Sequence, residues 1–560
     1  MQFRELVRHF FNGFFDVEII HPDAESKLGL GQILAVLAVP SLGMSAGLLF
    51  RGANAPPLWL NQAFYFFYGM SMIGFVTVFQ WDTLFLGRRD WVVLGALPLR
   101  TRRILAAKIG ALLQYLGLFV LTISGPTTLL LPLGFAASRE PMLAGLTMWI
   151  GQAIAIVAAS AFAFFGLIAM QGTLMNLLPA GLFRRITPII QMSALCLTLV
   201  ALFVYPKGIS LINPALPVAA QNPWLWWVPQ FWFLGLAQTI AGRPEPVWGQ
   251  LNTLALEGMA AVLVWAAGVY LLSYYRHAKR SLEQATEVAG TPSAWERAAA
   301  WLLNKAWLRD PIERAVFWFT VKTALRSRRH WLILGGYSGV GLAFVLDALL
   351  AGMVRSGGYA IFLKPSPRLF MVPLTLTFAI LAGLRFTFTI PAELRANWVF
   401  RMTESTDRQA YHRAVRKAMF LLTTLPVLTP VFVVEAVLWD APFAVAHAFV
   451  NALLSWVLVE AALLRFNKIP FTCSYLPGKA NLPFSAGLYF AVFATYSTAM
   501  ATIGYQALTK PGFRPLIVLV TVLAALALGL GWHRLQRLDS SGPLMFSDEP
   551  EALLALHLQP

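Results

Sequence analysis

Cysteine and charge are both scarce in this 560-residue sequence. With only two cysteines, Cys196 and Cys473, no disulfide framework can stabilise the fold. Neither has a second cysteine or a suitably spaced histidine nearby, so we expect no metal site. Charged residues make up 12% of the chain and hydrophobic residues 58%, which excludes an ordinary soluble globular protein.

Motifs for ATP hydrolysis are also missing. A Walker A loop needs Gly-x4-Gly-Lys-Ser/Thr, so that backbone amides and the lysine hold the phosphates. The only Gly-Lys pair, Gly478-Lys479, is followed by Ala480 and lacks the upstream glycine. A glycine-rich run at 335–341 lies inside an apolar stretch, lacks the lysine, and is better explained by close helix packing. The sequence therefore predicts no enzyme activity and no cofactor for this chain.

Apolar runs of about 18 or more residues, by contrast, recur along the whole sequence, and each is long enough to cross a bilayer core. They predict an all-α, polytopic membrane protein with twelve transmembrane helices, at about 32–50, 61–80, 107–134, 144–174, 186–206, 250–275, 331–352, 369–390, 418–438, 441–464, 485–508 and 515–533. The first 31 residues are too polar and aromatic for a secretory signal peptide.

The distribution of lysine and arginine predicts the orientation of these spans. If the N-terminus lies inside, only nine of the 43 cationic residues fall on the opposite side, and Arg385 lies within a span. The positive-inside rule then puts both termini in the cytosol of an inner (plasma) membrane. Anionic lipid headgroups account for the net charge of +17, so membrane lipids, not nucleic acid, are the expected partners.

Two basic loops indicate that the chain is duplicated. When Trp91 is aligned with Trp398, Arg88 meets Arg395 and Asp90 meets Asn397. Each loop follows the second apolar run of its half and precedes the third, as expected for two pseudo-repeated six-helix halves. The predicted segments are a first half (1–280), a cytosolic linker with an amphipathic helix (281–330), a second half (331–538) and a cytosolic tail (539–560).

Each half also opens with an amphipathic pattern, at 3–15 and again at about 312–323. Apolar residues recur there every three or four positions, which predicts a helix lying in the headgroup plane. An ordinary juxtamembrane helix that anchors the next span is the alternative interpretation.

The first basic loop resembles that of a known family. Arg88-Arg-Asp precedes a short apolar stretch, Leu97-Pro-Leu-Arg leads into the third span, and Lys108 lies early in that span. This arrangement is similar to the permease subunit of ABC-2 type (type V) ABC exporters. The resemblance implies that the loop is a coupling helix contacting a separate ATPase subunit, in two copies, which carries ATP and Mg.

By this resemblance, residues of the two basic loops dock the ATPase, with the apolar stretch entering a groove of the partner. The expected docking residues are Arg88, Arg89, Asp90, Trp91, Pro98, Arg100 and Arg103, followed, with weaker contact, by Arg395, Asn397, Trp398 and Arg401. The second half departs from the pattern, because Glu404-Ser-Thr-Asp replaces Leu-Pro-Leu-Arg. Its last outer loop is also only 509–514. An asymmetric pair is therefore expected.

The family also places short re-entrant helices between its fifth and sixth spans. Here residues 223–240 are dense in aromatic side chains yet too short to cross the membrane. We expect a short re-entrant or interfacial helix that forms an outer gate and is absent from the second half. A tryptophan-rich interfacial belt is the alternative. The gate residues are Trp224, Trp226, Trp227, Phe231 and Trp232.

Ionisable residues within the spans are few: Glu257, Asp347, Arg385, Glu435, His447 and Glu460. Because a charge in the bilayer is costly, such residues usually face protein or water. We expect Asp347 to pair with Arg385, and Glu460 to meet Arg465. The loop at 468–479 is interpreted as a structural turn in preference to a second docking surface.

Three functions fit this pattern. The favoured one is a permease that couples ATP hydrolysis by a partner to export of a lipid, a hydrophobic compound or a lipid-linked polymer. The alternative is an ion- or proton-coupled secondary transporter, which needs paired acidic residues near the midplane or broken central helices. A membrane enzyme acting on a lipid-linked substrate needs clustered polar residues outside, whereas Glu140, Glu245 and Asp440 are widely separated.

Overall fold

The computed structural model describes residues 2–15, 30–49, 58–86, 90, 94, 100–136, 142–210, 223–243, 245–283, 294–356, 362, 364–392, 397, 399–400, 408–464, 466, 469–472, 482–510, 512 and 515–540. α-Helices dominate these residues and no strand occurs among them, so the predicted all-α fold is confirmed. The chain divides into two compact units, Met1–Ala289 (unit 1) and Gly290–Pro560 (unit 2).

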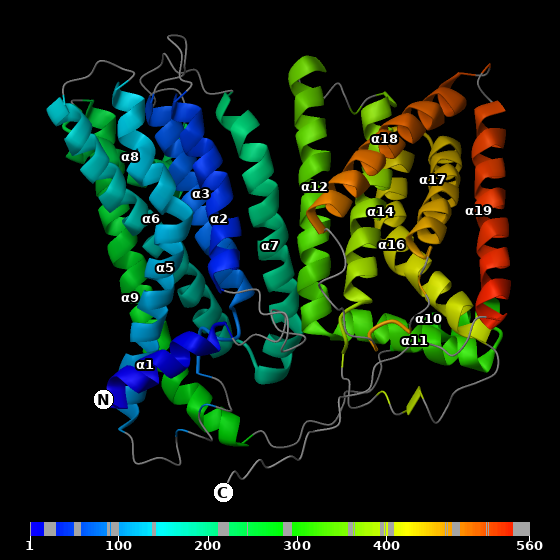
Figure 1. Ribbon diagram of the computed structural model, residues 1–560, viewed down its shortest axis with the longest axis horizontal. Coiled ribbons are helices and arrows are strands. Elements are labelled where there is room, and N and C mark those ends of the chain that lie inside the picture. The colour runs from blue at the N-terminus through cyan, green and yellow to red at the C-terminus, as the bar shows by residue number, and fades with distance from the viewer. Residues whose placement is uncertain are drawn as a thin grey trace, which may run out of the picture. The chain divides into compact units, whose positions relative to one another are not determined.

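Unit 1 is a bundle of long helices with two short ones (Figure 1). Proline occupies the first position of both α8 and α9, where its missing N–H costs nothing. The elements are α1 (Gln2–Gly13), α2 (Leu30–Leu49), α3 (Leu58–Phe79), α5 (Thr101–Ala136), α6 (Met142–Leu177), α7 (Ala180–Ser210), the 3-10 helix η1 (Pro223–Trp226), α8 (Pro229–Ile240) and α9 (Pro246–Glu283).

Unit 2 begins with two helices that precede its first long apolar one. The second of these is capped by Asp310, whose Oδ1 accepts a hydrogen bond from the Ile312 amide at 2.9 Å. The elements are α10 (Ala294–Ala306), α11 (Pro311–Arg326), α12 (Arg328–Ser356), α14 (Pro367–Thr387), α16 (Arg408–Leu438), α17 (Ala441–Ala462), α18 (Leu482–Thr509) and α19 (Pro515–Ser540).

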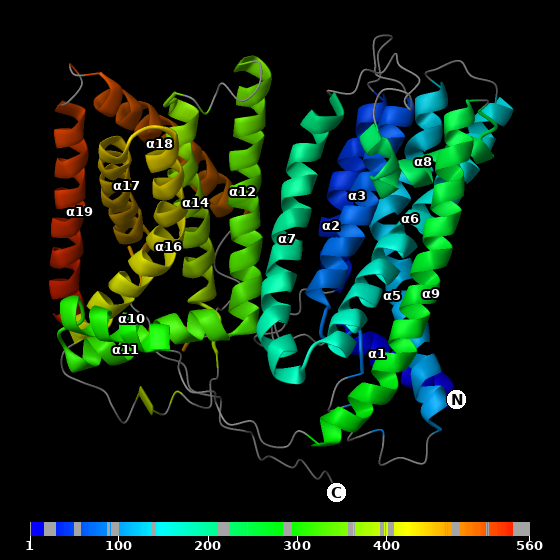
Figure 2. The same ribbon diagram turned by 180° about the vertical axis from the view of Figure 1, so that it is seen from behind.

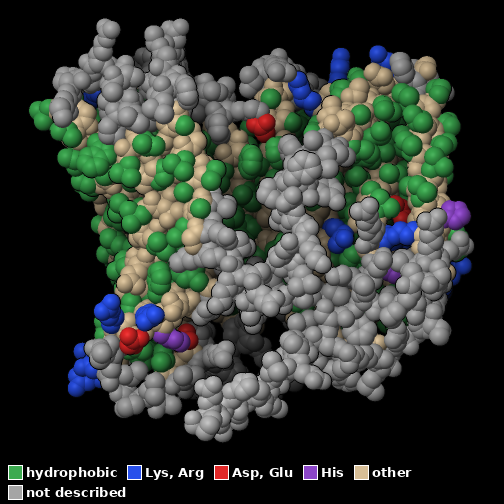
Figure 3. All heavy atoms as spheres, in the orientation of Figure 1, with side chains coloured by type: hydrophobic (Ala, Val, Ile, Leu, Met, Phe, Trp, Pro, Cys, Tyr) green, Lys and Arg blue, Asp and Glu red, His purple; other side chains and the backbone are tan. Residues whose placement is uncertain are grey.

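The helices identify a multi-pass membrane protein. Among the described residues, ten helices are long and apolar enough to cross a bilayer. Each of the twelve predicted runs overlaps one helix, although four of them extend one to three residues past its end. Helices α2 and α18 are the two outside those ten, so the number twelve stays a prediction. Apolar side chains cover the flanks of the helices (Figure 3), and Leu121, Leu143, Val264 and Val437 are each more than 70% exposed. Surfaces this apolar suit lipid better than water.

The two units share a pattern of helix packing. The amphipathic helix packs on the third apolar helix in each: α1 on α5, and α11 on α16. The second apolar helix packs on the third, fourth and fifth, as α3 does on α5, α6 and α7, and α14 on α16, α17 and α18. The fourth packs on the sixth, α6 on α9 and α17 on α19. The first helix differs, because α2 packs on α5 whereas α12 packs on α14. This shared pattern supports a duplicated six-helix arrangement.

In unit 1, the short helices α1 and α8 lie near opposite ends of the bundle (Figures 1 and 2). Helix α1 lies across the end where α5 begins, and its exposed charged side chains gather there (Figure 3). Helix α8 packs between α3, α6 and α9 toward the other end. These two places correspond to the predicted docking loop and the predicted gate.

Candidate functional site

The described residues of the first basic loop divide into an inward and an outward set. Leu94 is 7% exposed and packs into the core formed with α1 and α5. Arg100 and Arg103 are exposed at the start of α5. The expectation that the whole apolar stretch enters a partner's groove is therefore wrong at Leu94, because its side chain is already buried within unit 1. Among the described residues of this region, the outward set consists of cations.

The other docking residues predicted in this loop are less fully described. Arg88, Arg89, Trp91 and Pro98 lie outside the described residues. Asp90 is half-buried, and its carboxylate interacts electrostatically with Lys108. Asp90 therefore acts at least partly within the chain.

Lys108 joins α5 to the amphipathic helix. It is 3% exposed, and its Nζ lies 5.0 Å from the ring centroid of Phe10 and 4.7 Å from that of Phe14. Both are cation–π distances, which partly compensate a buried ammonium. Two residues further on, Gly110 lets Val7 approach α5 closely. Leu94, the start of α5 and α1 therefore form one packed body.

Unit 2 has a corresponding lysine. Lys417, on α16, lies 2.5 Å from a carboxylate oxygen of Glu313 on α11. Its Nζ also donates to the Trp307 carbonyl at 2.7 Å and lies 5.6 Å from the centroid of that indole ring. Glu313 is 4% exposed. In each unit, then, a lysine in the first turns of the third apolar helix fastens the amphipathic helix to it. We call this contact the lysine latch.

The second basic loop is held by hydrogen bonds within unit 2. Asn397, predicted to dock the ATPase, is 2% exposed and its Nδ2 donates to the Thr472 carbonyl at 2.8 Å. That prediction is wrong for Asn397, because its side chain is buried and already bonded. Arg395, Trp398 and Arg401 lie outside the described residues.

Phe471 is the centre of this loop structure. Its amide donates to the Phe388 carbonyl at 3.1 Å, and its own carbonyl accepts from the Ala392 amide at 3.0 Å. Its φ of 64° is left-handed, an uncommon conformation for a residue with a side chain. The ring packs against His330, whose Nε2 is 3.1 Å from the Ile390 carbonyl. Residues 469–472 are all buried, whereas the rest of the loop at 468–479 lies outside the described residues, so its interpretation as a structural turn stays a prediction.

The predicted gate region contains η1 and α8. With 12 residues, α8 is about 18 Å long and cannot cross the apolar core. Its aromatic residues point in different directions: Trp227 is 85% exposed, whereas Phe231 is 1% exposed. Trp232 Nε1 donates to the Trp226 carbonyl at 2.8 Å, which ties α8 to η1. The side chain of Trp224 is outside the described set.

A chain of three buried glutamines attaches α8 to two long helices. Gln238 on α8 donates to Gln62 on α3 at 2.6 Å, and Gln62 donates to Gln152 on α6 at 3.1 Å. All three are at most 3% exposed. Buried amides that bond only one another are typical of polar contacts between helices in a membrane.

Glycines bring α8 into backbone contact with its neighbours. A Cβ at Gly235 would lie 2.5 Å from the Leu251 Cβ and 2.9 Å from the Trp248 carbonyl of α9. A Cβ at Gly151 of α6 would lie 2.5 Å from the carbonyl of Ala237 on α8. The short helix is therefore packed on both sides and can move only together with α6 and α9.

The predicted intramembrane pair of Asp347 and Arg385 is wrong. Arg385 donates to the Ala462 carbonyl at 3.0 Å. Gly341 faces Ala379 across α12 and α14, and this register puts Asp347 about three turns from the level of Arg385. Glu460 pairs with Arg416 of α16, whereas its predicted partner, Arg465, lies outside the described residues.

One buried pair was not anticipated. His447 Nδ1 of α17 lies 2.8 Å from both carboxylate oxygens of Glu435 on α16. Asn451 and Ser455 follow on the same face, four and eight residues later. All three α17 residues are at most 2% exposed, and each has a polar atom without a hydrogen-bond partner among the described residues. We call His447, Asn451 and Ser455 the polar stripe. Only the spacing of these polar residues on an apolar helix could have signalled it.

No protein-family model, curated protein or solved structure matches this chain. Among the described residues, no group of three or more His, Cys, Asp or Glu side chains is arranged to hold a metal ion.

Proposed function

We propose that this chain is the membrane-spanning permease subunit of an ATP-driven ABC exporter. ATP and Mg would bind a separate ATPase subunit, present in two copies. The permease would lie in the inner (plasma) membrane with both termini in the cytosol. Its substrate would be a lipid, a hydrophobic compound or a lipid-linked polymer, in keeping with the apolar helices.

The lysine latch carries this proposal. A permease without its own ATPase must receive movement at a loop and pass it to its spans. In unit 1 the exposed Arg100 and Arg103 begin α5, and Lys108 lies about 12 Å further along that helix. Because Leu94, α5 and α1 are packed together, a push on the loop moves α5 and α1 as one body.

The contact with α8 supports the same mechanism at the other end of unit 1. Helix α6 carries Gln152 and Gly151, which hold α8, and α6 also packs on α5. A displacement of α5 would therefore reach α8 through one intervening helix. A gate formed by α8 would open through movement of these long helices, because α8 has no freedom to swing alone.

Copurification tests the proposed function. Affinity purification of the tagged chain from its native membrane should recover an ABC ATPase subunit and ATPase activity. The double variant Arg100→Glu/Arg103→Glu should reduce that recovery at least about tenfold, because each lost charge-assisted contact is worth about 1.5–3 kcal/mol. Its matched control is Lys364→Glu/Lys510→Glu, an equal charge reversal at two exposed cations predicted to lie outside.

Two results would contradict the proposal. One is the recovery of no ATPase subunit with the wild-type chain, and the other is the recovery of as much ATPase with the arginine double variant as with the control. Thermal unfolding of both double variants should match wild type, since all four side chains are exposed.

The polar stripe favours a second candidate, ion- or proton-coupled secondary transport. Glu435 and His447 form a protonatable pair inside the membrane region, and the stripe extends from it along α17. Purified chain alone, reconstituted in vesicles with a pH-sensitive dye inside, separates the two functions. Proton entry under an imposed pH gradient that Glu435→Gln abolishes would favour the secondary transporter. A silent dye together with a copurifying ATPase would favour the exporter.

A further inference from the structure

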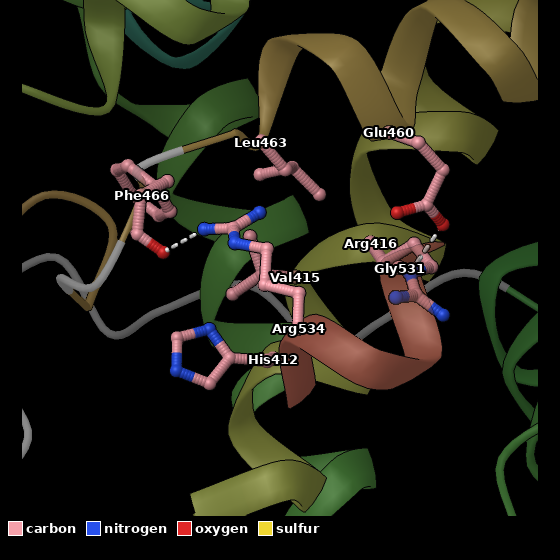
Figure 4. Close-up of a pocket in the computed structure, with 8 residues that line it drawn as sticks. All are labelled: His412, Val415, Arg416, Glu460, Leu463, Phe466, Gly531 and Arg534. Atoms are coloured by element: carbon pink, nitrogen blue, oxygen red, sulfur yellow. Dashed lines mark hydrogen bonds and ion pairs between the residues drawn. The ribbon is translucent and has the colours of Figure 1, made fainter. Parts of the chain in front are cut away.

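A cleft in unit 2 brings together cations from separate helices (Figure 4). Arg416 comes from α16, and Arg534 from the last turns of α19. Glu460, near the end of α17, is the one carboxylate among the described residues that line the cleft. Its apolar lining residues, Val415, Leu463 and Phe466, lie around the Arg534 guanidinium (Figure 4).

Positive charge exceeds negative charge in this cleft. Arg416 Nε is 2.8 Å from Glu460 Oε1, an ion pair by distance, although neither atom makes a well-directed hydrogen bond. Arg534 donates through one Nη to the Phe466 carbonyl at 2.7 Å. A guanidinium has five N–H donors, and two guanidinium groups share one carboxylate here. Arg385 adds further positive charge within electrostatic range of Arg534.

Gly531 makes this arrangement possible. A Cβ at that position of α19 would collide with the carboxylate of Glu460 and the guanidinium of Arg416. Helix α19 therefore closes directly over the ion pair, and Arg534, three residues later, projects beside it (Figure 4). Three helices therefore form the cleft together: α16 contributes Arg416, α17 contributes Glu460, and α19 contributes Gly531 and Arg534.

The surroundings put the cleft at the level of the lipid headgroups. Arg534 ends the apolar stretch of α19. Leu530 is 68% exposed and Trp532 50% exposed, so the neighbouring surface is apolar with a tryptophan at its edge. Tryptophan is enriched at membrane–water interfaces. The cation pattern of the sequence assigns this end of the helices to the cytosolic leaflet, where anionic lipids collect.

We propose that the cleft binds the phosphate of an acidic phospholipid headgroup. Arg534 and Arg416 donate to the phosphate oxygens, and Glu460 holds the Arg416 guanidinium in position for this. The planar fork of arginine matches phosphate geometry better than an ammonium does. The apolar wall of Val415, Leu463 and Phe466 contacts the glycerol and the first methylenes. The site is independent of whether the chain is an exporter.

Native mass spectrometry of the detergent-solubilised full chain, titrated with phosphatidylglycerol or phosphatidylcholine, tests this site. Wild type should bind phosphatidylglycerol more tightly. Arg534→Gln should weaken that binding at least about tenfold, the loss of one charge-assisted contact, and should weaken phosphatidylcholine binding less, because the choline cation offsets the charge of its phosphate. Arg534→Lys, which keeps the charge, should recover part of the affinity. Lys364→Gln, an exposed cation elsewhere, is the matched control and should bind as wild type does.

Arg416→Gln/Glu460→Gln provides a second variant, because it removes both charges together and leaves no buried carboxylate unpaired. This double variant should show the same loss of phosphatidylglycerol binding, and it tests the proposal if Arg534→Gln does not fold. Equal phosphatidylglycerol binding by wild type and a folded cleft variant overturns the proposal. So does a cleft-dependent response to inorganic phosphate in calorimetry without cleft-dependent lipid binding, since that result assigns the cleft to a soluble anion.

Discussion

Lys108 and Lys417 have the same position in their units but different partners. Two aromatic rings, Phe10 of α1 and Phe14 just after it, surround Lys108, with Asp90 nearby. Lys417 instead forms an ion pair with the buried Glu313. The penalty for removing each cation should therefore differ. Without Lys108, the aromatic rings lose only an attractive contact. Without Lys417, the buried carboxylate of Glu313 loses the positive charge that offsets the cost of its burial.

Lys417→Met should therefore destabilise the protein by about 3–5 kcal/mol, because Glu313 would be left as an uncompensated buried charge. Lys417→Met/Glu313→Gln should recover most of that loss. Lys108→Met, the matched substitution in unit 1, should cost only about 0.5–2 kcal/mol, the worth of its cation–π contacts. Thermal unfolding of each purified variant in the same detergent measures the order of their stabilities. If Lys108→Met and Lys417→Met were equally destabilising, the lysine latch would not depend on its partners in this way.

Residue-level predictions from the sequence failed where they needed distances across the fold. Asn397 is a polar residue in a basic loop, a pattern typical of the surface, yet the Thr472 carbonyl holds it inside. For Glu460 the structure describes Arg416, on another helix, as a partner, and no local pattern identifies it. The predicted partner, Arg465, lies outside the described residues.

At the scale of elements, the helix α8 was predictable and its attachment was not. Dense aromatic residues in a segment too short to cross a bilayer predicted the short helix at 223–240, and η1 and α8 occupy that segment. The glutamine chain joins residues 90 and 176 positions apart, so no sequence pattern shows it. The glycines at 151 and 235 likewise read as ordinary helix glycines until their neighbours are known.

Gly235→Ala tests whether α8 is packed as tightly as these contacts require. The new methyl group would meet the backbone of α9 at Trp248 and Asn252, which cannot rotate away as a side chain can. We expect destabilisation of about 1–3 kcal/mol, typical of overpacking. Gly249→Ala, on α9 itself, is the control, because nothing lies within 4 Å of the added carbon. Alanine should stabilise the helix slightly there. Equal melting temperatures for the two variants would mean that α8 separates readily from α9.

For the whole molecule, composition and apolar runs were sufficient to predict an all-α membrane protein, because lipid requires helices that satisfy their own backbone hydrogen bonds. Composition and apolar runs do not by themselves give the number of membrane crossings. Ten helices meet the requirements for spanning among the described residues, and α2 and α18 complete the predicted twelve. If either failed to cross, the sides assigned to the flanking loops would change.

Single-cysteine reporters test this topology in a background with Cys196 and Cys473 replaced by serine. Arg4→Cys and Arg100→Cys flank α2 and α3, and because α3 is long and apolar enough to span, they label on the same side only if α2 crosses as well. Leu464→Cys and Lys510→Cys flank α18 and label on opposite sides only if it crosses. Positions 4, 100, 464 and 510 are all exposed.

An impermeant maleimide should label only Lys510→Cys in intact cells, because the cation-rich side stays in the cytosol. Arg100→Cys labelled from outside would reverse the orientation, and with it the proposed docking of a cytosolic ATPase. Labelling of Arg4→Cys without labelling of Arg100→Cys would remove α2 from the spans, and protection of Lys510→Cys would remove α18.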